Sequence, residues 1–269
     1  MKRTGLGWKG TIGFVCGFIL AMTITHLPKL FNPWKAIGDR RIKRAILFGD
    51  SITQEASDPA QQGWVALLTA FWIRRIDVVN RGFGGYTSRW GLKLYDKVVL
   101  EQRPDVVFLF FGANDAVLAE HSQHVPLAEY KENLSIMVRK AQAMSIEVFL
   151  LTPPPVYEPV LEQRNKEKGK KLIVDRINSN TLLYVNACKD VGKEFHVPVV
   201  DNWTTLGGAS EQRGGFLRDG LHLSSQGNQQ IFENIKELIG DQFQHLRPEN
   251  IKLFQPHWSE IVENVDILN

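Results

Sequence analysis

Cysteine is nearly absent from this chain, which has only two among its 269 residues. Cys16 lies in an apolar N-terminal stretch, so the folded body keeps one thiol, Cys188. A single thiol excludes a disulfide framework, and the sequence contains no Cys/His cluster of the kind that binds zinc. One free thiol fits a reducing compartment. We interpret Cys188 as a small apolar residue on a helix rather than as a nucleophile.

The body of the chain also lacks a basic stripe, although the formal net charge is +3. Residues 1–44 hold nine of the 32 lysines and arginines and a single acidic residue, Asp39. The remaining 225 residues therefore carry 23 basic against 28 acidic side chains, a net charge of −5. Surfaces that bind nucleic acid are positively charged. This balance argues against a nucleic acid as a partner.

Long hydrophobic runs are scarce, and the apolar run at residues 11–27 is a borderline membrane span, because a bilayer core requires ~20 apolar residues. Threonines interrupt the run, and Lys2, Arg3 and Lys9 precede it. A secretory signal, a signal anchor, an organellar presequence and a docked N-terminal helix all fit this pattern. Basic residues also predominate after the run, which favours an anchor whose following chain stays cytosolic.

These observations divide the chain into two parts. Residues 28–43 contain two prolines and a glycine, which is typical of a linker. We predict that residues 1–43 form a targeting or anchor segment with its linker, and that residues 44–269 form the folded domain. Membrane association through residues 11–27 or organelle targeting is then the expected localisation, with the cytoplasm as the alternative.

What the body does contain is an alternation of short apolar runs and helix-like patterns. The runs are continuously apolar, which is typical of strands buried on both faces of a parallel sheet. They are residues 44–49, 76–81, 105–112, 146–153 and 197–203. Apolar residues at helical spacing occupy 63–75, 127–144 and 176–195, and terminal helices are expected at 232–240 and 251–265. The pattern predicts a three-layer α/β/α sandwich around five parallel strands.

Polar and glycine-rich stretches follow several of these runs. In open α/β sheets, ligands bind outside the carboxyl ends of the strands. Four stretches could meet there, at residues 49–51, 82–90, 112–116 and 218–224. The proline-rich segment 152–159 shapes a substrate pocket or serves as a plain connector, and the charged stretch 162–171 is expected to be a solvated loop or a frayed helix start.

The four stretches together contain the groups that acyl transfer needs. The hydroxyl of Ser51 requires a base, and His222 can supply it if a carboxylate such as Asp219 orients the ring. Three donors could stabilise an oxyanion: the Ser51 amide, the Gly85 amide and the side chain of Asn114. Each motif alone also fits an ordinary turn. Their joint occurrence, each past an expected strand, favours catalysis.

The motifs "GDSIT", "NRGFGGY", "GANDA" and "DGLHLS" resemble the four blocks of the SGNH, or GDSL-type, hydrolases. With "HVPLAEYKENL", "LLTPPPV" and "RINSNTLLYVNAC", the chain is similar to the isoamyl acetate-hydrolysing esterase branch over residues 44–240. The resemblance implies a flavodoxin-like fold, no metal or organic cofactor, a triad of Ser51, His222 and Asp219, and oxyanion donors at Ser51, Gly85 and Asn114.

One departure from that branch concerns the second block. The branch usually has Ser-Gly where this chain has Gly84-Gly85. The expected donor, Gly85, is retained, while loss of a hydroxyl at position 84 is expected to loosen the loop and lower the rate.

The sequence thus predicts a serine esterase for small to medium acyl esters, with a small-molecule ester as its partner. Two alternatives stay open. The same machinery could transfer or remove acyl groups on a glycan or a lipid, and the fold could belong to a non-catalytic binding protein. Neither the natural substrate nor the oligomeric state can be deduced from the sequence.

Overall fold

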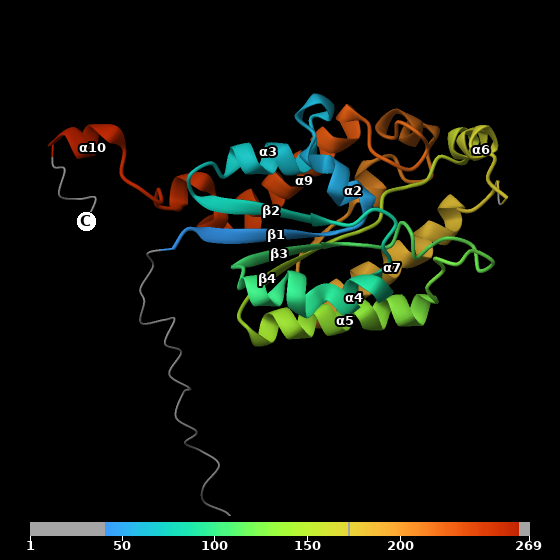
Figure 1. Ribbon diagram of the computed structural model, residues 1–269, viewed down its shortest axis with the longest axis horizontal. Helices are drawn as coiled ribbons and strands as arrows, with labels where there is room; N and C mark the ends of the chain where they lie inside the picture. Colours follow the sequence, from blue (N-terminus) through green and yellow to red (C-terminus); the bar gives the residue numbers. More distant parts are fainter. Residues whose placement is uncertain (1–40, 172, 264–269) are drawn as a thin grey trace, which may run out of the picture. The chain divides into compact units, whose positions relative to one another are not determined.

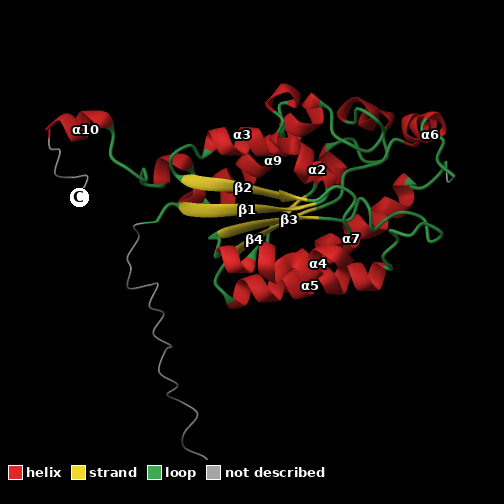
Figure 2. Ribbon diagram, viewed as in Figure 1, coloured by secondary structure: helices red, strands yellow, loops and turns green. Residues whose placement is uncertain are grey.

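A parallel sheet forms the centre of the fold. The computed structural model describes residues 41–171 and 173–263, so the apolar run at 11–27 lies outside the described residues. Within the described part the sheet has five strands in the order β2-β1-β3-β4-β5. They are β1 (Lys43–Gly49), β2 (Ile76–Gly82), β3 (Val106–Phe110), β4 (Glu147–Leu151) and β5 (Val199–Val200). Figure 2 shows the strands lying between two layers of helices.

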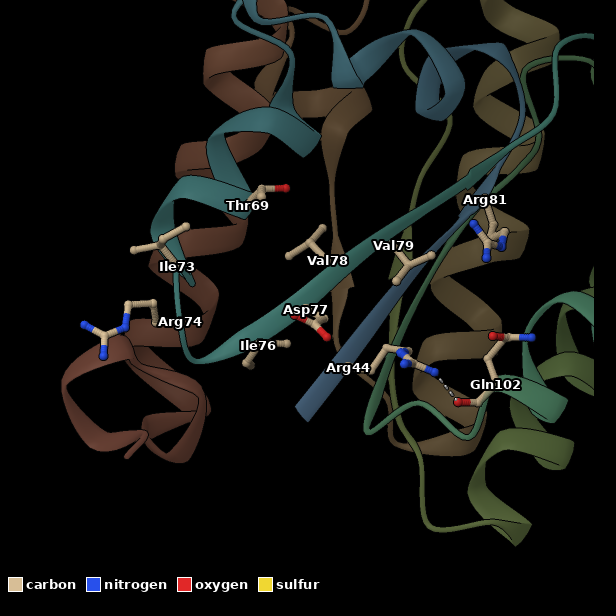
Figure 3. A pocket seen from close by; sticks show the side chains of 10 residues that line it. All are labelled: Arg44, Thr69, Ile73, Arg74, Ile76, Asp77, Val78, Val79, Arg81 and Gln102. Atoms are coloured by element: carbon tan, nitrogen blue, oxygen red, sulfur yellow. Dashed lines mark hydrogen bonds between the residues drawn. The ribbon is translucent and has the colours of Figure 1, made fainter. Parts of the chain in front are cut away.

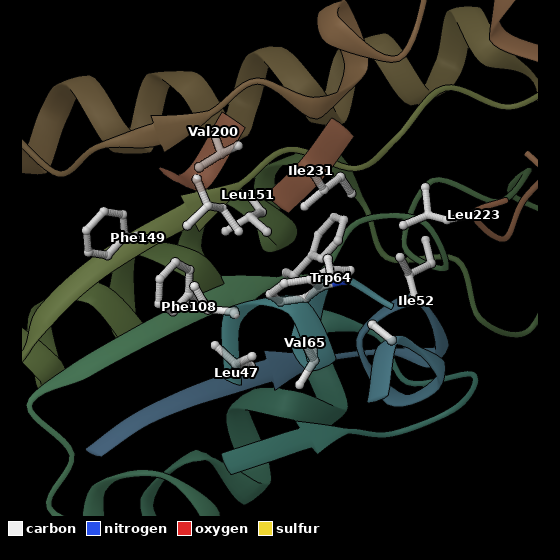
Figure 4. Close-up of a cluster of buried hydrophobic side chains, with 14 of the residues drawn as sticks. Leu47, Ile52, Trp64, Val65, Phe108, Phe149, Leu151, Val200, Leu223 and Ile231 are labelled. Atoms are coloured by element: carbon white, nitrogen blue, oxygen red, sulfur yellow. The ribbon is translucent and has the colours of Figure 1, made fainter. Parts of the chain in front are cut away.

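The inner strands are buried on both faces, which explains their continuous apolar character. Along β1, Ala45 and Leu47 pack into one cluster of buried side chains. Ile46 and Phe48 alternate with them and pack into a second cluster on the other face. In the first cluster, Leu47 and its neighbours on β3 and β4 lie close to Trp64 (Figure 4).

The helices that cover these two faces come from different parts of the chain. One face packs against α3 (Trp64–Phe71) and α9 (Ser225–Gln242). The other packs against α4 (Ser88–Val98), α5 (Leu127–Ala143) and α7 (Asn178–Phe195) (Figure 1). The predicted three-layer α/β/α sandwich with a five-stranded parallel sheet is therefore confirmed.

Three strands are shorter than the apolar runs predicted, and the run at 146–153 gives a strand only from Glu147 to Leu151. Within the run at 105–112, the strand ends at Phe110, because Gly112 has a φ of +124°, which a strand does not accommodate. The run at 197–203 yields only the two residues of β5. Asp201 ends it, since its side chain accepts from the Thr204 backbone and starts the short helix α8 (Asn202–Thr205).

Two helices differ from the prediction. The apolar pattern did not indicate α4, which has a glycine, Gly91, in its interior. A Cβ at that position would lie 2.7 Å from the Phe111 ring, so close packing on the sheet requires the glycine. The charged stretch 162–171 was expected to be a loop or a frayed helix start, but α6 (Glu158–Glu167) includes its first six residues.

The C-terminal segment also differs. The prediction of a sheet-covering helix at 251–265 is wrong, because among its described residues, 251–263, only α10 (Trp258–Glu263) is α-helical and Trp258 is 68% exposed. In the part of the chain that the structure describes, no helix has the length and apolar character to cross a bilayer. The remaining short elements are α2 (Ser51–Gln54), η1 (Glu55–Ser57), η2 (Pro59–Gln61), η3 (Leu100–Gln102), η4 (Glu211–Phe216), η5 (Gln244–Leu246) and η6 (Pro248–Asn250).

Candidate active site

Ser51 lies where the inner strand β1 gives way to α2, and Figure 1 shows α2 beside the ends to which the strand arrows point. Asp50 caps α2, because its Oδ1 accepts from the Ile52 amide at 2.9 Å. A Cβ on Gly49 would lie 2.5 Å from the Phe110 carbonyl oxygen, so only glycine fits at this position without a clash. Crowding at the strand end thus explains Gly49, and capping of α2 explains Asp50, directly before Ser51.

Ser51, His222 and Asp219 form one hydrogen-bonded chain. His222 Nε2 lies 3.0 Å from Ser51 Oγ, although 171 residues separate the two in sequence. His222 Nδ1 lies 2.9 Å from Asp219 Oδ2. An ionised carboxylate can only accept, so Nδ1 carries the proton and Nε2 presents its lone pair to the serine hydroxyl. The predicted convergence of these three residues at one edge of the sheet is therefore observed.

Asp219 is held in its ionised form. Burial alone would raise its pKa, but the hydrogen bond and charge of His222 hold the pKa of Asp219 below its usual range. The backbone amide of His222 donates to Asp219 Oδ1 at 2.7 Å. From α6, Arg164 Nη1 adds a positive charge 3.3 Å from Oδ2. The carboxylate can thus orient the imidazole without taking up its proton.

The loop that carries Asp219 and His222 is fixed by contacts on both sides. Gly220 has φ of +80° and accepts from the Tyr157 amide at 2.9 Å, and a Cβ there would lie 2.6 Å from Leu161 N. On the other side, Arg218 pairs with Glu55, in the short helix that follows α2. The loop is therefore tied to η1, the short helix directly after the one that begins at Ser51.

Gly85, one of the predicted oxyanion donors, lies in a loop tied to α2. It has φ of +78°, and its carbonyl accepts from Gln123 Nε2 at 2.6 Å. Gln54, in the same short helix as Ser51, accepts from the Gly84 amide at 2.7 Å. In the described residues the amides of Ser51 and Gly85 have no intramolecular acceptor. Both amides are therefore free to meet a ligand.

Asn114, the other predicted donor, is 4% exposed and follows β3. Its Nδ2 donates to the Tyr86 carbonyl at 2.9 Å, which ties it to the Gly84–Gly85 loop. Its Oδ1 accepts from Arg176 Nη2 at 2.8 Å. The second Nδ2 hydrogen has no recorded partner among the described residues. Use of these donors in an oxyanion hole stays a prediction.

Four residues that contact this site were not predicted from the sequence: Gln54, Gln123, Arg164 and Arg176. Arg176 lies 62 residues from Asn114 in the chain, and no local pattern connects the two. A buried arginine that contacts a loop this far away in the sequence has no spacing signal, so only the three-dimensional arrangement identifies it.

Two further carboxyl groups are buried near the site. Burial raises the pKa of Asp50 to about 7, against the opposing effect of the hydrogen bond from Ile52. Burial likewise raises the pKa of Asp115 to about 6, opposed by the Ser88 hydroxyl and amide that donate to it. They are not arranged as a metal site: within residues 41–171 and 173–263 no three His, Cys, Asp or Glu side chains are grouped to hold an ion.

The Gly84–Gly85 pair yields a matched prediction. A Cβ on Gly84 would lie 3.3 Å from the flexible end of Gln54, and Gly84 has no left-handed φ, so G84A is expected to keep kcat within about 3-fold. G85A places a side chain at left-handed φ, which costs about 1–2 kcal/mol. If the backbone relaxes to relieve that strain, the Gly85 amide moves away from the position of the oxyanion, and kcat is expected to fall about 10- to 100-fold. Ester hydrolysis rates of the two variants check this, and equal rates would contradict it.

A separate cavity lies along the outer strand β2 and has a volume of about 400 Å³. Figure 3 shows its lining side chains, among them Arg44, Arg74 and Arg81. None of the predicted site residues lines it. All three arginines donate to backbone carbonyls of the protein.

Comparison with known proteins agrees with this geometry. The model of the GDSL-like lipase/acylhydrolase family matches residues 47–230. A Mus musculus protein named isoamyl acetate-hydrolyzing esterase 1 homolog is 38% identical over 229 residues, which cover 82% of this chain and 88% of that protein. The isoamyl acetate-hydrolyzing esterase of Saccharomyces cerevisiae is 31% identical and covers 82% of this chain and 96% of its own.

A solved structure is also similar. The lipase/acylhydrolase from Enterococcus faecalis is 28% identical, with a TM-score of 0.61, and the match covers 80% of this chain and 100% of that chain. The family match includes the positions of Ser51, Asp219 and His222. The similarity therefore extends over both the sheet and the hydrogen-bonded chain at its edge.

Proposed function

Because this chain belongs to the GDSL-like lipase/acylhydrolase family, we propose that it hydrolyses esters of short to medium acyl groups through an acyl-enzyme on Ser51. Ester hydrolysis as such follows from the family and from the esterases to which the chain is similar. Acetate esters of small alcohols, isoamyl acetate among them, are the proposed substrates, because two of these relatives are named for that ester.

The acylation step begins with proton transfer. His222 Nε2 removes the hydroxyl proton of Ser51 as Oγ attacks the ester carbonyl carbon. Negative charge develops on the carbonyl oxygen, and the proposed donors are the amides of Ser51 and Gly85 and the side chain of Asn114. Asp219 stabilises the imidazolium that forms. The imidazolium then protonates the leaving alcohol, and the acyl group stays on Oγ.

Deacylation repeats the same chemistry with water. His222 removes a proton from the water as it attacks the acyl carbonyl, and the second oxyanion uses the same donors. Collapse of this intermediate releases the carboxylic acid and returns the proton to Ser51 Oγ. Neither step requires a cofactor, because His222 accepts and returns each proton and the proposed donors stabilise each oxyanion.

The observation that carries the proposal is the continuous chain from Ser51 Oγ through His222 to Asp219, with distances of 3.0 and 2.9 Å. A serine hydroxyl is a poor nucleophile unless a base lies within hydrogen-bond reach. The structural contact therefore supports the role of each residue. Arg164 adds support, since its positive charge lies 3.3 Å from Asp219 Oδ2 and favours the ionised carboxylate.

The purified full-length protein tests the proposal. Hydrolysis is measured with isoamyl acetate and with p-nitrophenyl esters of increasing acyl length, and a fluorophosphonate probe is mapped by mass spectrometry. We expect hydrolysis of the short esters and labelling of Ser51. Labelling of another residue, or no hydrolysis of any ester, would rule the proposal out.

We also propose that residues 11–27 associate the protein with a membrane. Their apolar composition and the basic residues on both sides support this. Recovery of the full-length protein in membranes after carbonate washing is the expected result. Complete recovery in the supernatant before washing would contradict it.

A further inference from the structure

Asn114 can serve an oxyanion in only one of its two amide orientations. The NH2 group stabilises a negative charge, whereas the carbonyl oxygen would repel it, and the two ends have nearly the same shape. Here Oδ1 accepts from Arg176 and Nδ2 donates to the Tyr86 carbonyl. A guanidinium only donates and a carbonyl oxygen only accepts, so both neighbours select the orientation that presents an N–H.

Arg176 holds the loop after β3 at two successive residues. Its Nε donates to the Ala113 carbonyl at 3.0 Å, while Nη2 donates to Asn114 Oδ1 at 2.8 Å. These two bonds use the planar fork of the guanidinium, which a lysine cannot reproduce. Two more contacts hold this loop: the Leu118 amide donates to the Asp175 carbonyl, and Asn180, in the first turn of α7, donates to the Ala116 carbonyl.

The charge of Arg176 is buried and compensated. Arg176 is 5% exposed, and its Nη1 lies 2.9 Å from Asp175 Oδ2, on a side chain that is 1% exposed. Burial alone would raise the pKa of Asp175, but the charges of Arg176 and Lys170 hold that pKa below its usual value. A buried ion pair contributes little net stability compared with apolar packing, so stability alone does not account for its presence.

We propose that Arg176 is a positioning residue, which orients and polarises the Asn114 amide so that its free N–H stabilises the oxyanion. The inference rests on the proposed function, since it assigns a role within the same site. The guanidinium draws electron density from Oδ1, which makes the Nδ2 hydrogens more positive. Its contribution grows only when negative charge develops on the substrate, and it therefore acts on kcat rather than on KM.

A double-mutant cycle tests the inference. N114A is expected to lower kcat about 10²- to 10³-fold, which leaves measurable activity above the Ser51→Ala background. R176M in the parent protein is expected to lower kcat about 10- to 100-fold with KM within about 3-fold. In the N114A background, R176M should cost less than about 3-fold, because the amide through which it acts is gone.

Arg213 supplies a matched control. It is also a buried arginine, and it donates to the carbonyls of Val156, Ala209 and Ser210 and to Glu158 without contacting Asn114. Whatever R213M does to kcat, the factor should be the same with and without N114A. R176K provides a second variant that keeps the charge, and its smaller loss in kcat should also vanish in the N114A background.

The outcomes separate this inference from the proposed function. An R176M or R176K effect of equal size in both backgrounds, or an unchanged kcat in the parent, overturns the positioning role while the esterase assignment stands. Parent-level hydrolysis by S51A overturns the esterase assignment and the positioning role together. If R176M does not fold, the R176K cycle gives the same decision.

Discussion

Replacement of Ser51 by alanine is expected to lower kcat for p-nitrophenyl acetate by about 10⁴- to 10⁶-fold. The substitution removes only the hydroxyl that lies 3.0 Å from His222 Nε2. The Asp50 cap on the Ile52 amide and the Ser51 backbone amide both remain. The loss therefore reports the nucleophile itself, and initial rates at saturating ester measure it.

Ser57 gives the control for this experiment. It lies six residues further along the chain, and its Oγ accepts from Asn80 Nδ2 at 2.7 Å. S57A removes a hydroxyl of the same size near the same helix, and it should keep kcat within about 3-fold. Thermal unfolding of S51A should match the parent. Hydrolysis by S51A at the parent rate would eliminate Ser51 as the nucleophile.

Replacement of Asp219 by asparagine is expected to lower kcat by about 10⁴-fold. Asparagine can still accept from the amides of Leu221 and His222 through its oxygen. Its NH2 group then faces His222 Nδ1, which must become an acceptor, so the ring proton moves to Nε2. Ser51 then meets a donor where it needs a base. A shape-preserving substitution thus reverses the direction of the whole hydrogen-bonded chain.

The effect of D219N should depend on His222. The double variant with H222A is expected to lie within about 10-fold of H222A alone, because residues that act as one unit are not additive. D96N, which removes an exposed carboxylate paired with Lys140, serves as the matched control and should leave kcat unchanged. Multiplicative losses in the double variant would show that Asp219 does not act through the imidazole.

Much of the fold could be predicted because its signals are local. The run at 44–49 is apolar at every position after its first residue until Gly49, and a strand buried on both faces requires that composition. The helix predicted at 127–144 from its apolar spacing likewise agrees with the bounds of α5 to within one residue. The four polar stretches after the strands could be placed at one edge because parallel strands share their direction.

The errors have identifiable physical causes. Gly91 weakens the helical signal of α4, but its lack of a Cβ allows close contact with Phe111. The charges at 162–171 suggested a solvated loop or a frayed helix start, whereas Glu158 in the first turn of α6 and Arg164 and Lys166 in its last turn suit a solvated helix. In α4 the close packing on Phe111 outweighed the low helix propensity of glycine. In α6 the charges at the helix ends favoured a helix where the charged sequence suggested solvated chain.

The amino-acid order alone specified the alternation of elements, the position of the proposed nucleophile Ser51 and the Asp-x-x-His turn, because each is a pattern over a few neighbouring residues. It could not specify that Arg176 would reach Asn114 across 62 residues, or that Arg164 would approach Asp219. Such contacts arise when crossovers bring distant segments together at the sheet edge, and folding in three dimensions sets their distances. The proposed nucleophile could therefore be chosen from the sequence, whereas the arginines that contact Asp219 and Asn114 emerged only from the fold.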